Sequence, residues 1–397
     1  MTERVYVTGW GIISALGNDI EENLHALKNK KSGISSPLFL KTNYANQKVV
    51  GEVKLSNNDL KKQLGFEVSK TISRTALLGM IAAKESIRLS GLSSNELHSA
   101  LFFNGTSVGG MDVSEVHYKA FLEGEEVNYK EAFSGHDCGH STETIANYIG
   151  ALGETSTIST ACSSSANTIM QACRTIKGGK AEVAIAGGTD ALSVFTLNGF
   201  NSLKILDDHP CKPFDKNRKG LNLGEGAAYL VLESERSVRA RGANVLGEVI
   251  GYGNANDAYH QTASSPQGEG ALNAMRKAMS VADDISIDYI NVHGTGTGNN
   301  DMSESMAVNS LFKENMPLYS STKAYTGHTL GAAGAIEAVF SLLSLRHNLL
   351  FPCLRVDTPM DVISQPPIFD VVEKEVNTVM SNSLGFGGNC SALIFKK

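Results

Sequence analysis

The stretch TSTISTACSSSANTIMQACRTIKGG, residues 155–179, says most about the fold. Residues 155–160 are typical of a strand. From Ser163 onward, apolar residues fall at positions 166, 169, 170, 173 and 176, which predicts an amphipathic helix that Gly178 and Gly179 end. A strand that turns directly into a helix is a unit of α/β proteins, so this stretch predicts that class.

The rest of the chain repeats the same alternation of strands and helices. Strands are expected at residues 5–10, 100–105, 155–160, 182–188, 227–233, 246–253, 289–292, 317–321, 379–383 and 391–397. Helices are expected at residues 20–33, 71–90, from 163, 268–282, 301–313 and 331–346. This order favours an α/β fold in which helices cover largely buried sheets.

The composition limits the classes of protein. The 397 residues suggest two domains or one duplicated domain, and the 42% hydrophobic and 19% charged residues suit a globular protein. The net charge of −6 argues against nucleic-acid binding. We find no leader pattern and no apolar run of transmembrane length, so we expect a cytoplasmic protein without membrane contact.

Cys162 is the candidate nucleophile among six cysteines, whose spacing predicts no metal site and no CxxC pair. It lies where the strand turns into the helix, and free backbone N–H groups at a helix start favour a thiolate. We therefore expect a lowered pKa for Cys162. The alternative is a buried structural thiol, which is what the apolar stripe predicts for Cys173.

His293 follows the expected strand 289–292 and opens the segment HGTGTG. Ligands of open α/β sheets bind at the carboxyl ends of strands, and the glycines allow a close backbone approach. Thr295 and Thr297 place two hydroxyls on one side of an extended chain. The spacing is not that of a phosphate loop. A structural histidine is the alternative.

His328 lies at the start of an Ala-rich expected helix that contains Glu337, and Lys323 lies in the same strand-to-helix loop. A helix N-terminus favours a neutral imidazole, which can donate a hydrogen bond to a developing oxyanion or enolate. Taken singly, these residues could be a helix cap, a loop lysine and a surface carboxylate. Together with Cys162 and His293 they suit acyl transfer followed by carbon–carbon bond formation.

The sequence resembles the β-ketoacyl-acyl-carrier-protein synthases of the elongating type over nearly its whole length. The motifs, in order, are residues 5–17, 159–165, 186–191, 213–233, 257–266, 293–301, 321–338 and 382–395. The resemblance implies the thiolase fold, with two similar halves stacked as five α-β-α-β-α layers. We expect the halves at residues 1–245 and 246–397, and a homodimer or a heterodimer with a related subunit.

The resemblance also implies roles for individual residues. Cys162 accepts an acyl chain from a carrier-protein thioester, and its backbone N–H forms an oxyanion hole with that of Phe386. His293 and His328 promote malonyl decarboxylation, Lys323 supports the site, and Glu337 is its partner. Thr295 and Thr297 hold the phosphopantetheine arm, and Phe386 is also an aromatic gate.

Carrier proteins are acidic, so the resemblance implies a basic docking rim, for which Lys70, Arg74 and Lys204 are candidates. Residues 107–120 resemble the dimer side of the acyl pocket. No metal or diffusible cofactor is expected, because the carrier protein brings the phosphopantetheine arm.

Some positions depart from the usual motifs. Gly298 replaces a proline, Asn389-Cys390 replaces Thr-Asn, and Arg218-Lys219-Gly220-Leu221 replaces Arg-Asp-Gly-Phe. These changes leave open whether the enzyme serves fatty-acid synthesis or a specialised polyene or polyketide pathway with a chain-length-setting partner. A thiolase, a non-catalytic partner subunit and an initiating synthase are further alternatives. Cys390 is the only candidate for the second cysteine that a thiolase needs, Cys162 argues against the partner subunit, and an initiating synthase would have an asparagine for one histidine.

Overall fold

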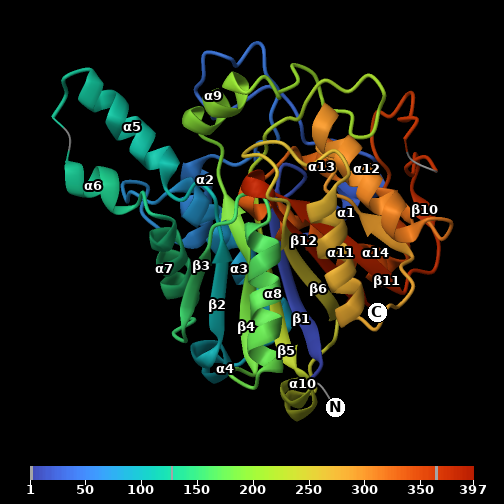
Figure 1. The fold of residues 1–397 in the computed structure, drawn as a ribbon. Coiled ribbons are helices and arrows are strands. Elements are labelled where there is room, and N and C mark those ends of the chain that lie inside the picture. The colour runs from blue at the N-terminus through green and yellow to red at the C-terminus, as the bar shows by residue number, and fades with distance from the viewer. Residues whose placement is uncertain (1–2, 127, 363–364) are drawn as a thin grey trace.

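The computed structural model describes residues 3–126, 128–362 and 365–397, and among these residues ten strands form one mixed sheet (Figure 1). The first five strands are β1 (Val5–Ser14), β2 (Leu101–Gly105), β3 (Thr155–Ile158), β4 (Val183–Asp190) and β5 (Gly226–Ser234). The other five are β6 (Gly247–Asn256), β7 (Tyr289–Asn291), β8 (Leu318–Ser320), β11 (Thr378–Leu384) and β12 (Asn389–Lys396). A small second sheet pairs β9 (Leu349–Leu350) with β10 (Val372–Glu373).

The strand order is the same in the two halves of the large sheet. The full order is β3-β2-β4-β5-β1-β6-β12-β11-β7-β8. Each half contributes five strands to this sheet, which can be counted in chain order. In both halves the first of the five is innermost, and the fifth, fourth, second and third follow outward. The halves join where Tyr6 and Val7 of β1 pair with Glu248 and Gly247 of β6.

Helices divide the molecule into five layers. Helix α3 (Arg74–Ser90) packs on one face of β1, β5 and β4, and α11 (Glu269–Val281) packs on β6 and β12. Between the two parts of the sheet lie α8 (Ser164–Lys177) and α14 (Ala333–His347), which contact strands of both halves and each other. Residues 333–345 of α14 are all buried, as a helix enclosed by two sheets requires. The predicted five-layer α/β fold is confirmed.

The remaining helices lie at the edges and in the connections between strands. They are α1 (Ile20–Lys28), α2 (Asn57–Leu64), α4 (Ser94–Ser99), α5 (Met111–Leu122), α6 (Tyr129–Ser134), α7 (Cys138–Ile149), α9 (Val194–Ser202), α10 (Glu235–Arg241), α12 (Gly298–Phe312) and α13 (Lys323–Thr326), with 3-10 turns η1 (Leu330–Ala332) and η2 (Phe386–Gly388). The helix expected over residues 20–33 ends early, at Lys28, because Asn29 caps it and Lys30 takes a positive φ of 54°.

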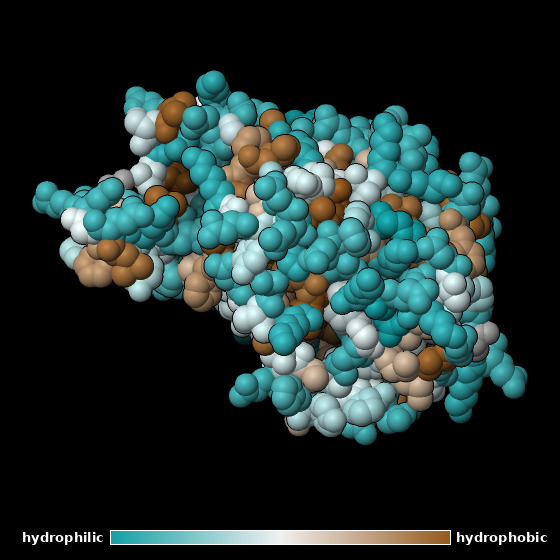
Figure 2. Space-filling view, turned by 90° about the horizontal axis from the view of Figure 1, so that it is seen from above, coloured by the Kyte–Doolittle hydropathy of each residue, from teal (hydrophilic) through white to brown (hydrophobic). Residues whose placement is uncertain are grey.

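Helices α5 and α6 form an arm that projects from the body beside the edge strand β3 (Figure 1). Figure 2 shows brown, hydrophobic surface on this projection. The exposed apolar side chains of the arm are Val116, Tyr118, Phe121, Leu122, Tyr129 and Phe133. Of the helices in the described ranges, none is both long and apolar enough to cross a membrane.

Candidate active site

Cys162 lies in a tight turn between β3 and α8. Ala161 before it has a positive φ of 53°, a conformation that non-glycine residues rarely adopt and that is associated with functional sites. The Ser164 hydroxyl stabilises the turn, since it donates to the carbonyl of Ala161 (2.6 Å) and accepts from the N–H of Thr160 (2.9 Å). The Cys162 side chain is thereby held at the head of α8.

The expected low pKa of Cys162 is wrong for this state of the protein. Burial raises the pKa of the Cys162 thiol to about 11, although the charge of Lys323 and the backbone N–H of Phe386 act in the opposite direction. Cys162 is only 6% exposed, so the lost hydration of a thiolate outweighs the favourable position at the helix start. The thiol therefore keeps its proton at neutral pH.

His293 and Lys323 are in direct contact. The ammonium of Lys323 lies 3.1 Å from Nδ1 of His293 and forms a buried ion pair with Glu337. Because an ammonium can only donate, Nδ1 of His293 accepts and Nε2 carries the proton. Burial, then the charge of Lys323, lowers the pKa of His293 well below its usual value. Burial also raises the pKa of Glu337 to about 7, against the effect of Lys323.

His328 is held in the same tautomer by the backbone. Its Nδ1 accepts from the N–H of Leu330 (3.1 Å), which leaves the proton on Nε2. Its main chain pairs with Asn222 and Gly224, with the His328 N–H donating to the Asn222 carbonyl at 2.7 Å. Burial, then Lys323, lowers the pKa of His328. The ring is neutral as expected, but α14 begins only at Ala333, so the helix start is not the cause.

The two imidazoles lie together, with ring centroids 5.2 Å apart and planes at 84°. They line a cavity of about 270 Å³ together with Cys162, Thr295, Thr297 and Phe386. The hydroxyl oxygens of Thr295 and Thr297 are 3.0 Å apart, so the two threonines do face the same side. Segments from both halves of the chain thus place a thiol, two N–H donors and two hydroxyls around one space.

Two carboxylates that sequence reasoning missed hold the HGTGTG segment in place. Glu304 accepts from the backbone N–H groups of His293 and Gly294, both at 2.8 Å. Asp301 accepts from those of Thr295 (3.0 Å) and Gly296 (3.1 Å). Asp301 and Glu304 are three residues apart on α12, hence on one helix face, and this spacing just after a glycine-rich loop was the available signal.

Phe386 lies in the turn between β11 and β12, close to Cys162. Its ring stacks on that of Phe200, with centroids 5.5 Å apart and planes at 16°. A hydrogen bond from its backbone N–H to the thiol is one of the influences that lower the pKa of Cys162. Phe200, from α9, also lines the cavity and was not predicted as a site residue.

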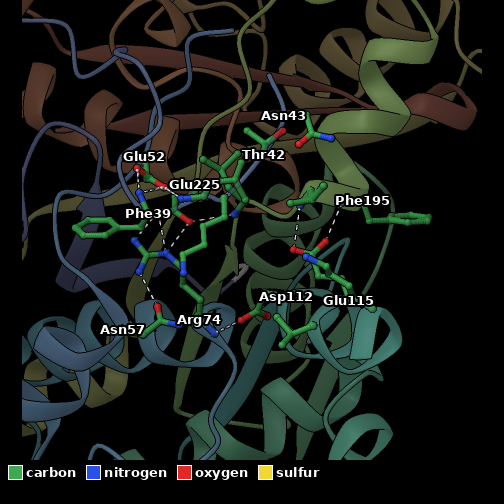
Figure 3. Close-up of a pocket in the computed structure, with 16 residues that line it drawn as sticks. Phe39, Thr42, Asn43, Glu52, Asn57, Arg74, Asp112, Glu115, Phe195 and Glu225 are labelled. Atoms are coloured by element: carbon green, nitrogen blue, oxygen red, sulfur yellow. Dashed lines mark hydrogen bonds and ion pairs between the residues drawn. The ribbon is translucent and has the colours of Figure 1, made fainter. Parts of the chain in front are cut away.

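The three docking candidates do not share one environment. Lys70 and Lys204 are exposed. Arg74 is only 6% exposed, and its guanidinium bonds to Glu225, to Asn57 (2.7 Å) and to the carbonyl of Val53 (3.1 Å), as Figure 3 shows for Glu225 and Asn57. A buried, paired guanidinium cannot meet a protein on the surface, so the structure contradicts the docking role for Arg74. The sequence did not indicate this burial, because the partners Val53, Asn57 and Glu225 come from other parts of the chain.

The described part of the chain contains no group of three or more His, Cys, Asp or Glu side chains that could hold a metal ion.

Comparison with known proteins shows the family. Residues 2–237 match the N-terminal domain of β-ketoacyl synthases and residues 246–357 match the C-terminal domain. Among curated relatives, 3-oxoacyl-[acyl-carrier-protein] synthase 2 of Staphylococcus aureus (strain COL) is 32% identical, covering 100% of this chain and 98% of the relative. The synthase 1 of Haemophilus influenzae (strain Rd) is 33% identical, covering 99% of both.

Solved structures of ketosynthases have a similar fold. The ishigamide ketosynthase/chain length factor gives a TM-score of 0.94 with 29% identity, covering 100% of both chains. A ketosynthase in complex with its chain length factor from Xenorhabdus doucetiae gives 0.83 with 31% identity, covering 99% of this chain and 98% of the other. The chain belongs to the β-ketoacyl synthase family. The predicted family, the thiolase fold and the assignment as a condensing acyltransferase are confirmed.

Proposed function

We propose that the protein catalyses the decarboxylating condensation of a Cys162-bound acyl chain with malonyl-acyl-carrier protein, giving a β-ketoacyl-acyl-carrier protein. The observation that carries the proposal is the meeting of Cys162, His293 and His328 at one cavity, with both imidazoles neutral and protonated on Nε2. A nucleophile with two neutral N–H donors suits a reaction that first forms a thioester and then an enolate.

In the first half-reaction the Cys162 sulfur bonds to the acyl carbonyl carbon of the carrier-protein thioester. The bond from that carbon to the pantetheine sulfur breaks, and the thiol proton passes to the departing sulfur. The backbone N–H groups of Cys162 and Phe386 bind the carbonyl oxygen as negative charge develops. The raised pKa of Cys162 keeps the resting thiol unreactive toward other electrophiles, because the thiolate is the nucleophile.

In the second half-reaction malonyl-carrier protein occupies the cavity. The bond to its carboxylate breaks, CO₂ leaves, and the electron pair forms an enolate whose oxygen is bound by Nε2–H of His293 and of His328. The enolate carbon attacks the Cys162 thioester, the carbon–sulfur bond breaks, and the released thiolate takes up one proton. Lys323 and Glu337 keep His293 neutral and oriented. Thr295 and Thr297 hold the phosphopantetheine arm, which the carrier protein supplies in place of a diffusible cofactor.

The pathway is fatty-acid synthesis in our main proposal. The alternative is a specialised polyketide pathway, which is favoured by the likeness to two ketosynthases that are paired with chain length factors. A thiolase is disfavoured because Cys390, the candidate for its second cysteine, follows a GFGG turn that resembles the synthases, and HGTGTG is the synthase motif. Failure to thiolyse acetoacetyl-coenzyme A is the expected result for this chain.

We also propose a dimer, either with a second copy or with a related subunit. The exposed apolar arm α5–α6 and the free edge of β3 support an interface there, because such surface is rarely left open to water. Residues 1–245 and 246–397 are proposed as the two thiolase-like halves, in line with the repeated strand order and the two family matches. The proposed location is the cytoplasm, and Lys70 and Lys204 remain the proposed docking residues.

The test is intact-protein mass spectrometry after incubation with a panel of acyl-carrier proteins, with Cys162→Ala alongside. We expect an acyl mass on the wild type but not on the variant, and its loss with formation of an elongated product when malonyl-carrier protein is added. Acylation by straight saturated chains supports fatty-acid synthesis, and acylation only by polyene or aryl chains with a partner subunit supports the specialised pathway. Equal labelling of Cys162→Ala would refute the proposal.

A further inference from the structure

A single side-chain oxygen, Oδ1 of Asn389, connects the two turns that form the oxyanion hole. Asn389 begins β12 directly after the Phe386–Gly388 turn, and its carbonyl accepts from the N–H of Gly385 (2.8 Å), which closes that turn. Its Oδ1 accepts from the hydroxyl of Ser163 (2.7 Å), the residue after Cys162. The bond therefore lies close to both N–H donors of the hole, since Cys162 directly precedes Ser163 and Phe386 is three residues before Asn389.

Two more asparagines fix the same oxygen. Nδ2 of Asn167, in the first turn of α8, donates to Oδ1 of Asn389 at 3.0 Å, and Nδ2 of Asn254, in β6, donates at 2.8 Å. Asn167 also donates to the hydroxyl of Thr160 (2.9 Å) and accepts from that of Ser391 (2.7 Å). The network therefore joins residues from both halves of the chain behind the nucleophile.

The turn needs such an anchor because its own backbone is permissive. Gly387 and Gly388 have φ values of 78° and 81°, where glycine is favoured, and three of the four residues 385–388 are glycine. A Cβ on Gly385 would lie 2.9 Å from the carbonyl oxygen of Thr160 and 3.2 Å from the nitrogen of Cys162, so the two turns are packed directly on each other. A small shift of the glycine turn would therefore move the Phe386 N–H away from the reacting carbonyl.

We infer that Asn389 is a positioning residue for acylation, which holds the Phe386 turn at the distance from Cys162 that makes the two N–H groups one oxyanion hole. This inference rests on the proposed function of Cys162. Motifs of this family usually carry threonine here, whose hydroxyl is bonded to Cβ and stands one bond closer to the main chain. The longer carboxamide of Asn389 brings its oxygen within reach of three donors at once, on Ser163, Asn167 and Asn254.

The experiment compares Asn389→Ala with Ser391→Ala, which removes two bonds of the same network, to Asn167 and from Asn254, neither of which involves Asn389. We measure the single-turnover rate of Cys162 acylation by acyl-carrier protein and, separately, the rate of alkylation by iodoacetamide, which needs the thiol but no oxyanion hole. Asn389→Ala should slow acylation at least about tenfold. The loss should be smaller than the 10²–10³ of a deleted donor, because the Phe386 N–H is displaced rather than removed. The alkylation rate of Asn389→Ala should fall much less than its acylation rate, since alkylation loses only the help that the Phe386 N–H gives the thiolate, and both rates of Ser391→Ala should stay within about threefold of wild type.

Wild-type acylation by Asn389→Ala would overturn the inference, as would equal losses in the two variants or a parallel loss of alkylation. If Asn389→Ala does not fold, Asn389→Thr takes its place, with a slowing of acylation between about threefold and tenfold expected and an unchanged rate refuting the idea. Absence of acylation in the wild-type protein, with Cys162→Ala as the control, would instead refute the proposed function.

Discussion

Replacing His328 tests the assignment of the two imidazoles more directly than any other substitution. His328 lies in the buried cavity, is neutral, and carries its proton on Nε2 because Leu330 occupies Nδ1. In the proposed second half-reaction it provides one of two N–H donors to the enolate oxygen. Removing one such preorganised donor costs about 3–4 kcal/mol of transition-state stabilisation. His328→Ala should therefore slow decarboxylation of malonyl-carrier protein by about 10²–10³.

The same substitution should leave acylation nearly intact, since the oxyanion hole that we propose for that step consists of backbone N–H groups. The assay is mass spectrometry of both proteins, which follows the loss of the malonyl group and the gain of acyl mass on Cys162 in separate reactions. His328→Asn, whose carboxamide can again donate, should recover about tenfold of the lost rate. His260→Ala is the matched control, because His260 lines the mouth of the same cavity but is exposed.

Acylation and decarboxylation that fall together in His328→Ala would refute this division of labour, as would a decarboxylation rate within threefold of wild type. A loss equal to that of His328→Ala in His260→Ala would show that the cavity as a whole, rather than one donor, determines the rate.

Three further predictions concern the thiol, the buried ion pair and the docking surface. Because burial raises the pKa of Cys162 to about 11, the thiolate fraction rises with pH up to that value, so alkylation should accelerate about tenfold per pH unit between pH 7 and 9; a plateau below pH 8 would contradict this. At pH 9, above the pKa of about 7 of Glu337, Glu337→Gln should lower the free energy of unfolding by about 3–5 kcal/mol, because it removes the carboxylate that neutralises the buried Lys323 charge. Glu235→Gln in the exposed pair with Arg239 should cost less than about 1 kcal/mol, and equal midpoints in urea would refute the contrast. Lys70→Glu and Lys204→Glu should raise the KM for carrier protein without changing the thermal midpoint. Arg74→Met should instead lower the thermal midpoint, because Glu225 loses its buried partner. An unchanged KM in both lysine variants would exclude these two lysines from the proposed docking surface.

The sequence by itself determined the elements that carry the site. Strand and helix signals act over a few residues, so the turn at Cys162, the loop after β7 and the segment before α14 could be located from neighbours along the chain. The helices of the arm were not predicted, since exposed apolar side chains at α5 obscure the usual pattern of one buried face. The motifs were also sufficient to identify the family.

Properties that depend on distant residues were decided only by the tertiary structure. The pKa of Cys162 is raised because the whole fold buries it, against a local helix signal that pointed the other way. Arg74 is buried because Glu225, 151 residues further along, lies beside it. The imidazole tautomers and the Asn389 network likewise depend on partners such as Lys323 and Ser163, up to 226 residues away. Burial and hydrogen-bond partners are properties of three-dimensional neighbours, and a local pattern carries no information about them.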